Sequence, residues 1–101
     1  MGLLRLKLFI AGGSSRAEQA VANLRAICRG RSLLPCDVTV IDVLDSPEAA
    51  EAHKIIATPT LLKEYPYPQK RIIGDLSDVQ AILKLLNLAG TEEDAPRPAS
   101  P

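Results

Sequence analysis

The fold of this chain is decided by one stretch, Ile55-Ile56-Ala57-Thr58-Pro59-Thr60-Leu61-Leu62. A short predicted helix ends before it, and an apolar strand begins after Pro59. Proline fixes its own φ angle and drives the preceding residue toward extended geometry, so Thr58-Pro59 predicts the entry into a strand. Only about 5–6% of X-Pro bonds in folded proteins are cis, so the residues alone favour a trans bond before Pro59.

Upstream of this stretch, the chain begins with a strand and a helix. Apolar residues occupy every second position in the segment 3–10, which predicts a strand. A glycine- and serine-rich turn follows, and Ser14 or Ser15 can cap the next helix, which Gly30 ends. We interpret this turn as a plain turn and not as an anion site, because neither a Walker pattern nor G-x-G-x-x-G is present.

A second strand and a short helix complete the approach to Pro59. The segment 36–43 carries apolar residues on both faces, which is typical of a parallel strand covered on both sides. Ser46 and Pro47 then predict a helix over residues 47–54, with Ser46 as its cap and Pro47 in its first turn. We expect His53 to be a surface or half-buried side chain.

Downstream of Pro59, the pattern predicts a hairpin and a last helix. Strands over 60–64 and 70–73 flank a Pro-rich tip, whose two tyrosines either stack on a ligand or cover the end of the hairpin. Ser77 and Gln80 match a capping box that opens the helix. The predicted buried stripe of this helix, which Gly90 ends, consists of Val79, Ile82, Leu83 and Leu86.

Length and charge indicate a single small domain. We expect one domain over residues 1–90 and a flexible tail over 91–101, because the tail is acidic, then rich in Pro, Ala and Ser. Lys plus Arg and Asp plus Glu both number 12, so the formal net charge is zero, which argues against nucleic-acid binding. No apolar run is long enough for a membrane span or a signal peptide, so the expected compartment is the cytoplasm.

The cysteines and the histidine offer no catalytic or metal site. We interpret Cys28 and Cys36 as small buried hydrophobic residues, and we expect no disulfide between them in a reducing cytoplasm. Two cysteines and His53 are too few for a convincing zinc site. We therefore expect no metal and no cofactor.

Several stretches together resemble the circadian clock family KaiB. They are residues 6–12, 40–44, 54–61 and 71–77, and the resemblance extends from about residue 4 to 89. It implies a thioredoxin-like α/β fold, βαβαββα, with a four-stranded mixed sheet in the order 2-1-3-4, helices on both faces and a cis bond at Pro59. It also implies a family that can switch the fold of its C-terminal half, with a tetrameric alternative state.

The function that the resemblance implies is protein binding and not catalysis. KaiB-like proteins bind the ATPase ring KaiC in their thioredoxin-like state, sequester KaiA and compete with a clock sensor kinase. An alternative is a divergent KaiB paralogue with a different, stress-related partner. Thioredoxin-like redox catalysis is a third hypothesis, which we disfavour because the loop that carries the redox cysteines in thioredoxins holds Gly and Ser here.

The resemblance also points to partner-binding residues. Lys54, Lys70 and Arg71 match basic positions of the family, and Lys7 on the first strand and Thr39 on the second are further candidates. Clock members carry a Lys where this chain has Thr39 and an Arg where it has Gln19, and both differences weaken the case for KaiC and KaiA. The second strand is expected to lie at an edge of the sheet, where its free backbone groups can pair with a partner strand. A solvated face is the alternative role of the basic residues.

Two positions in the last helix are expected to bias the fold switch. Clock members carry a Gly and an Asp that oppose helix formation where this chain has Leu85 and Asn87. Gly to Leu in a helix interior favours helix by roughly 0.6–0.8 kcal/mol. We therefore predict that the thioredoxin-like monomer dominates in solution.

Overall fold

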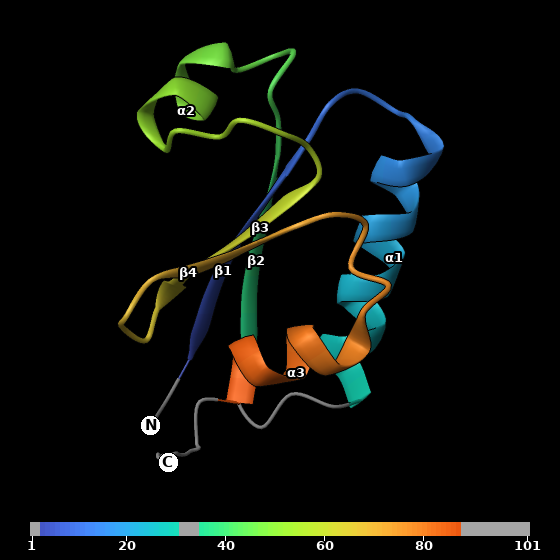
Figure 1. The fold of residues 1–101 in the computed structure, drawn as a ribbon, viewed down its shortest axis with the longest axis vertical. Coiled ribbons are helices and arrows are strands. Elements are labelled where there is room, and N and C mark those ends of the chain that lie inside the picture. The colour runs from blue at the N-terminus through green and yellow to red at the C-terminus, as the bar shows by residue number, and fades with distance from the viewer. Residues whose placement is uncertain (1–2, 31–34, 88–101) are drawn as a thin grey trace.

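The computed structural model describes residues 3–30 and 35–87. Its elements follow the predicted order βαβαββα (Figure 1). They are β1 (Leu4–Ile10), α1 (Ser15–Gly30), β2 (Cys36–Asp42), α2 (Pro47–Ala52), β3 (Thr60–Tyr65), β4 (Lys70–Ile73) and α3 (Val79–Asn87). The predicted helix end at Gly90, the domain end at residue 90 and the tail over 91–101 lie outside the described residues.

The four strands form one mixed sheet in the order β2-β1-β3-β4, as the resemblance implies. β1 pairs with β2 in parallel, so that Leu4 lies opposite Cys36 and Ile10 opposite Asp42. β3 runs antiparallel to both β1 and β4. The β1–α1–β2 crossover therefore places β2 at one edge of the sheet, and the β3–β4 hairpin forms the opposite edge.

The hydrophobic core lies between the sheet and the two longer helices. α1 and α3 lie on the same side of the sheet, whereas α2 lies beyond the end at which β1 and β2 finish (Figure 1). The buried residues that meet there are Leu4, Leu6, Leu8, Leu61 and Leu76 with Ala20, Leu24 and Ile27 of α1 and Ile82 and Leu85 of α3. The alternation in β1 and the helical spacing in α1 predict this packing from the sequence.

The opposite face of the sheet is less covered than we predicted. Its end near α2 is closed, where the His53 ring lies 5.4 Å from the ring of the fully buried Phe9. The expectation that β2 is covered on both sides is wrong, because Thr39 is exposed and Val40 is 40% exposed. β2 is an edge strand without a helix across its second face, so apolar residues on both of its faces do not mean double coverage.

The start of α3 differs from the predicted capping box. The side chain that caps α3 is Asp78, whose Oδ1 accepts a hydrogen bond from the backbone N–H of Ala81 at 3.2 Å. Ser77 instead donates its own N–H to Oδ1 of Asp75 at 3.1 Å, and hydrogen bonds from the Ser77 hydroxyl and amide lower the pKa of Asp75. This turn takes Ser77 away from the helix, so Gln80 has no capping partner there.

The buried stripe of α3 also differs by position. Ile82 is fully buried and Leu83 packs half-buried against the core, as predicted, but Val79 is 37% exposed. Leu85, which we did not predict, is buried, and the side chain of Leu86 lies outside what the structure describes. Val79 is the first residue of the helix and lines a hollow with Gln19 and Asn23 of α1. Leu85 thus contributes to the core as well as to helix propensity.

Replacing the cap should destabilise the protein measurably. We expect Asp78→Ala to lower the free energy of unfolding by about 1 kcal/mol, because the N–H of Ala81 loses its acceptor. Urea unfolding followed by circular dichroism measures this loss. Gln80→Ala is the matched control, since Gln80 is exposed, and an equal loss in both variants would contradict the assignment of the cap to Asp78.

Two further features concern the backbone before β3 and the two cysteines. The Thr58–Pro59 peptide bond is cis, in the geometry that the family resemblance implies. Cys28 and Cys36 form a disulfide, so the expectation of two unlinked thiols is wrong for this structure. The crossover brings the end of α1 to the first residue of β2, with the two Cα atoms 6.0 Å apart, and spacing in the sequence does not reveal this contact.

The other helix expectations hold in part. Ser14 is the cap of α1, since its Oγ accepts a hydrogen bond from the N–H of Ala17 at 3.1 Å. Pro47 lies in the first turn of α2 as predicted, but Ser46 makes no side-chain capping bond. At the hairpin tip Tyr65 and Tyr67 are exposed and pack edge to face, with ring centroids 6.0 Å apart.

Candidate protein-docking surface

The outer edge of β2 offers a backbone surface for a partner strand. Among the described strands β2 pairs only with β1, so no described strand lies along its outer side. Thr39 projects from one face of this edge, and Val40 projects from the other. An exposed edge strand with apolar side chains is a template for pairing with another chain.

A groove along α1 lies on the same side of the molecule as the β2 edge. Its volume is about 590 Å³, and its lining is mostly small or apolar, including Ile10, Ala17, Val21 and Ala22. Arg25 and Arg29, both exposed, border it. A smaller hollow beside it is lined by Val21 and Arg25 of α1 together with Val38 and Val40 of β2. α1 and β2 therefore form one continuous surface with an apolar floor and a rim on which Arg25 and Arg29 outnumber Glu18.

Asp42 fixes the loop at the end of this surface, and the sequence analysis did not single it out. Its Oδ1 accepts hydrogen bonds from the N–H of Gly12 at 3.0 Å and from the N–H of Leu44 at 2.9 Å. Gly12 adopts φ +67°, and a Cβ atom there would lie 3.3 Å from the Leu44 side chain. The carboxylate occupies the Gly12 N–H, which agrees with a plain turn at this loop. A glycine before a helix and an aspartate at a strand end are the only sequence signals of this pairing.

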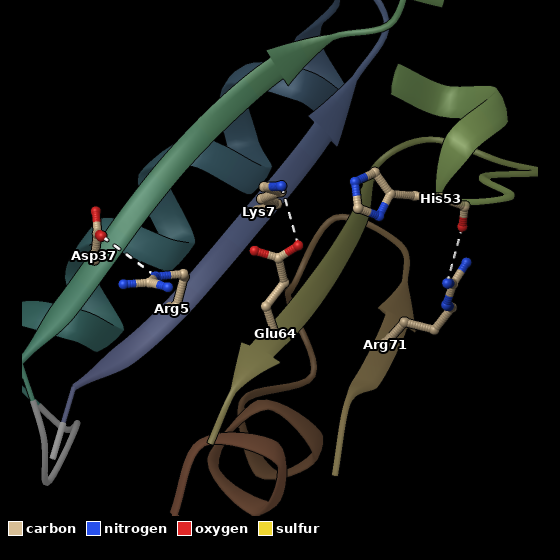
Figure 2. A network of polar contacts seen from close by, with 6 residues as sticks. All are labelled: Arg5, Lys7, Asp37, His53, Glu64 and Arg71. Atoms are coloured by element: carbon tan, nitrogen blue, oxygen red, sulfur yellow. Dashed lines mark hydrogen bonds and ion pairs between the residues drawn. The ribbon is translucent and has the colours of Figure 1, made fainter. Parts of the chain in front are cut away.

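Three of the predicted partner-binding residues lie in one row across the open face. Thr39, Lys7 and Arg71 belong to consecutive register positions on β2, β1 and β4, with Leu62 of β3 between the last two. Figure 2 views this face, opposite α1, and shows Lys7 and Arg71 on the same side of the sheet. The row carries both charge signs, because Asp37 and Glu64 lie beside it (Figure 2).

The charged groups in and beside this row pair largely with other groups of the same chain. Nζ of Lys7 lies 3.0 Å from a carboxylate oxygen of Glu64, and Nε of Arg5 lies 3.8 Å from a carboxylate oxygen of Asp37. Arg71 donates to the backbone carbonyls of His53 at 3.0 Å and Lys54 at 3.1 Å. Arg71 thus holds the segment between α2 and β3 against the hairpin, which is a structural role that the sequence did not indicate.

The other two predicted residues lie elsewhere. Lys54 follows α2 with φ 56°, and its side chain is exposed. Lys70 lies opposite Lys63 on β3 and therefore faces the α1 side of the sheet, away from Arg71. The five predicted partner-binding residues do not form a single site.

Gln19, where clock members carry an Arg, takes part in an internal chain of hydrogen bonds. Its Nε2 donates to Oδ1 of Asn23 at 2.9 Å, and Nδ2 of Asn23 donates to the carbonyl of Asp75 at 2.9 Å. These bonds tie the middle of α1 to the turn before α3. Asn23 was not singled out in the sequence because its partner lies far along the chain.

The chain matches the KaiB domain family over residues 7–88, which is most of its length. The chain belongs to the KaiB family. It is 43% identical over 88 residues to the circadian clock protein KaiB3 of Synechocystis sp., an alignment that covers 87% of this chain and 86% of the relative. It is 47% identical over 83 residues to the circadian clock oscillator protein KaiB of Prochlorococcus marinus, covering 82% of this chain and 70% of the relative.

Solved structures independently support the thioredoxin-like fold of this KaiB-family chain. The N-terminal domain of Synechococcus elongatus SasA superposes with a TM-score of 0.75 at 24% identity, covering 91% of this chain and 89% of that domain. Mitochondrial thioredoxin 3 of Saccharomyces cerevisiae superposes with a TM-score of 0.65 at 20% identity, covering 83% of this chain and 76% of the thioredoxin. At these identities the likeness shows the fold alone.

Family membership confirms the prediction of a non-enzymatic circadian clock protein. KaiB-family clock proteins act without catalysis, and the surface described above is suited to contact rather than to chemistry. Within residues 3–30 and 35–87 no cluster of His, Cys, Asp or Glu is suited to hold a metal ion. In the same part of the chain, no helix has the length and apolarity needed to cross a membrane.

One buried charge in this KaiB-family chain was missed by sequence reasoning. Lys63 lies opposite Leu6 and Lys70, on the core side of the sheet, and is 0% exposed. Its Nζ has no hydrogen-bond partner among the described residues. Burial lowers the pKa of the Lys63 amino group, and the nearby charge of Lys70 lowers it further. The signal was available, because Lys63 shares its face of β3 with the core residue Leu61.

Proposed function

We propose that this chain is a clock adaptor. In its own thioredoxin-like state it binds the ATPase ring of a KaiC-type partner. Binding then regulates the phosphorylation of the clock and its output. The observation that carries the proposal is the open outer edge of β2 beside the groove on α1. Membership of a family of circadian clock proteins gives the class of partner.

The surface suits a partner that supplies a strand or an apolar helix with acidic neighbours. Backbone groups along an edge strand give affinity by pairing, and side-chain pockets give specificity. Here the pockets are the α1 groove and the smaller hollow at Val40, and Arg25 and Arg29 border the groove. KaiA and a clock sensor kinase are further proposed partners.

The proposal includes a dominant monomer with the βαβαββα fold and a rare alternative fold. Two features of α3 support it: Leu85 is buried against the sheet, and Asp78 caps the helix. Asn87 is the last residue of α3 and has no helix-breaking character comparable to Gly. A tetramer seen by light scattering at micromolar concentration would contradict this part of the proposal.

A single charge on the edge should separate docking from folding. We expect Val40→Asp to weaken binding to a purified KaiC ring by at least about tenfold, because the carboxylate would be desolvated in an apolar contact. Biolayer interferometry with the immobilised ring measures the dissociation constants.

Val79→Asp is the matched control for this experiment. Val79 is 37% exposed and Val40 is 40% exposed, but Val79 lies on α3, away from β2. Equal weakening by both variants, with both still folded, would contradict docking through β2.

A second candidate function is binding of a different partner by a divergent, stress-related KaiB paralogue. The observation that favours it is the loss of basic residues at Thr39 and Gln19, where Gln19 is engaged with Asn23. If the wild-type chain does not bind the KaiC ring, but Val40→Asp abolishes capture of another clock or stress protein, this second function replaces the first.

A further inference from the structure

Cys28 and Cys36 lie where the end of α1 comes close to the start of β2. Cys28 is in the last turns of α1, and Cys36 is the first residue of β2, and the structure joins them by a disulfide. Both side chains are half-buried and pack at the edge of the core. Their Cα separation of 6.0 Å lies within the range that a disulfide requires.

This pair is distinct from the redox site of thioredoxins. In thioredoxins the reactive cysteines occupy the loop before α1, which here carries Gly12, Gly13 and Ser14. Cys28 and Cys36 instead flank the connection between the other end of α1 and β2. Half-burial leaves the sulfur atoms within reach of small reagents, whereas a fully buried disulfide would be inert.

We propose that Cys28 and Cys36 are a reversible redox modification site that acts on the edge strand β2. The oxidant that fits is a small disulfide such as glutathione disulfide. One cysteine thiolate attacks a sulfur of the oxidant and releases a glutathione thiolate. The second cysteine thiolate then attacks the protein sulfur of the mixed disulfide and releases the second glutathione thiolate. The two cysteine protons pass to the two glutathione thiolates, so two thiols are oxidised and one disulfide is reduced.

The effect on β2 follows from the position of the bond. Leu4 of β1 lies opposite Cys36, and the N–H of Leu4 donates to the carbonyl of Pro35 at 2.8 Å, so the start of β2 is held on its inner side by β1. The disulfide adds a covalent link from this point to α1. When the bond is reduced, the start of β2 is held only by sheet hydrogen bonds and by the packing of Cys36 and Val38 at the edge of the core. Local opening there no longer meets a covalent restraint, so the strand edge becomes less ordered.

The first experiment tests the site without any partner. The full chain is equilibrated in glutathione buffers from fully reduced to fully oxidised, its free thiols are alkylated, and it is weighed by mass spectrometry. We expect a single transition in which both cysteines lose reactivity together and the monomer loses about two hydrogen masses. Cys28→Ser and Cys36→Ser should each remove this loss and leave one glutathione adduct. Intermolecular dimers, or two independent glutathione adducts, as the oxidised end state would overturn the proposal.

The second experiment tests the action on β2. We expect hydrogen exchange at the amides of residues 36–38 to be at least about tenfold faster in the reduced protein, with β4 unchanged. The double variant Cys28→Ala/Cys36→Ala should match the reduced protein under oxidising conditions. Equal exchange in both redox states would overturn the coupling of the cysteine pair to the strand.

The consequence for partner binding rests on the proposed function. We expect the oxidised chain to bind the KaiC ring at least about threefold more tightly than the reduced chain, because its edge strand is already ordered. Equal binding by both forms would overturn this regulatory consequence. If neither form binds the ring while the redox transition and the exchange difference persist, the proposed partner is wrong and the redox site stands.

Discussion

Leu85→Gly is expected to lower the free energy of unfolding by about 3–6 kcal/mol. Leu85 is 6% exposed and packs in the core with Ile82 and the strand leucines, and truncation of a buried leucine costs about 2–5 kcal/mol. Glycine within a helix costs a further 0.8–1.0 kcal/mol or so relative to alanine. Domains of this size are stable by only about 5–15 kcal/mol, so the variant should lose a large share of its stability.

Urea unfolding followed by circular dichroism measures the loss, and light scattering measures the mass of the folded particle. Leu85→Met is the control, because it nearly conserves volume and should cost less than about 1.5 kcal/mol. The proposed bias of the fold switch predicts that Leu85→Gly also raises the tetramer fraction. A variant that unfolds at the urea concentration of the wild type would show that Leu85 does not hold α3 on the sheet.

Lys63→Met is expected to raise the free energy of unfolding by about 1–3 kcal/mol at neutral pH. The Lys63 amino group is fully buried without a hydrogen-bond partner among the described residues, and burial of such a group without compensation costs about this much. Methionine fills a similar volume without a polar atom. Lys84→Met on the exposed side of α3 is the control and should change stability by less than about 0.5 kcal/mol.

The gain should depend on pH with a definite sign. The pKa of Lys63 in the folded protein is lowered from its ordinary value of 10.5, so the unfolded chain binds this proton more tightly than the folded chain. The wild type is therefore destabilised below the folded pKa, and its stability rises as the pH increases from there toward 10.5. The difference between Lys63→Met and wild type should shrink over that window, and a difference that is constant with pH would contradict an unpaired buried amine.

The parts of the fold that depend on local patterns could be predicted from the sequence. The leucines of β1 alternate with polar residues, Ser14 precedes a helical stripe of small and apolar residues, and Pro59 marks the start of β3. Each of these signals acts within a few residues, so local physics decides it. The position of β2 at the edge of the sheet followed from the family resemblance and not from the composition of the strand.

The remaining features depend on which of several possible contacts forms, and the sequence alone does not decide this. Ser77 and Asp78 are both good capping residues, and the turn formed with Asp75 decides between them. Arg71 carries a charge typical of a binding surface, yet its guanidinium group donates hydrogen bonds to the carbonyls of His53 and Lys54. The pairing of Cys28 with Cys36 requires the crossover between α1 and β2 to be in place.

The order of the strands has a consequence for how this protein can change over evolutionary time. The edge formed by β2 and the groove on α1 belong to the first 42 residues, whereas Lys63 lies on β3, and Asp78 and Leu85 cap and anchor the last helix. The proposed docking surface and the residues that hold the back half in its fold thus lie in separate stretches of the sequence. Chimeras that join the first part of one relative to the second part of another, near Asp42, would let the docking surface and the fold of the C-terminal half be exchanged separately.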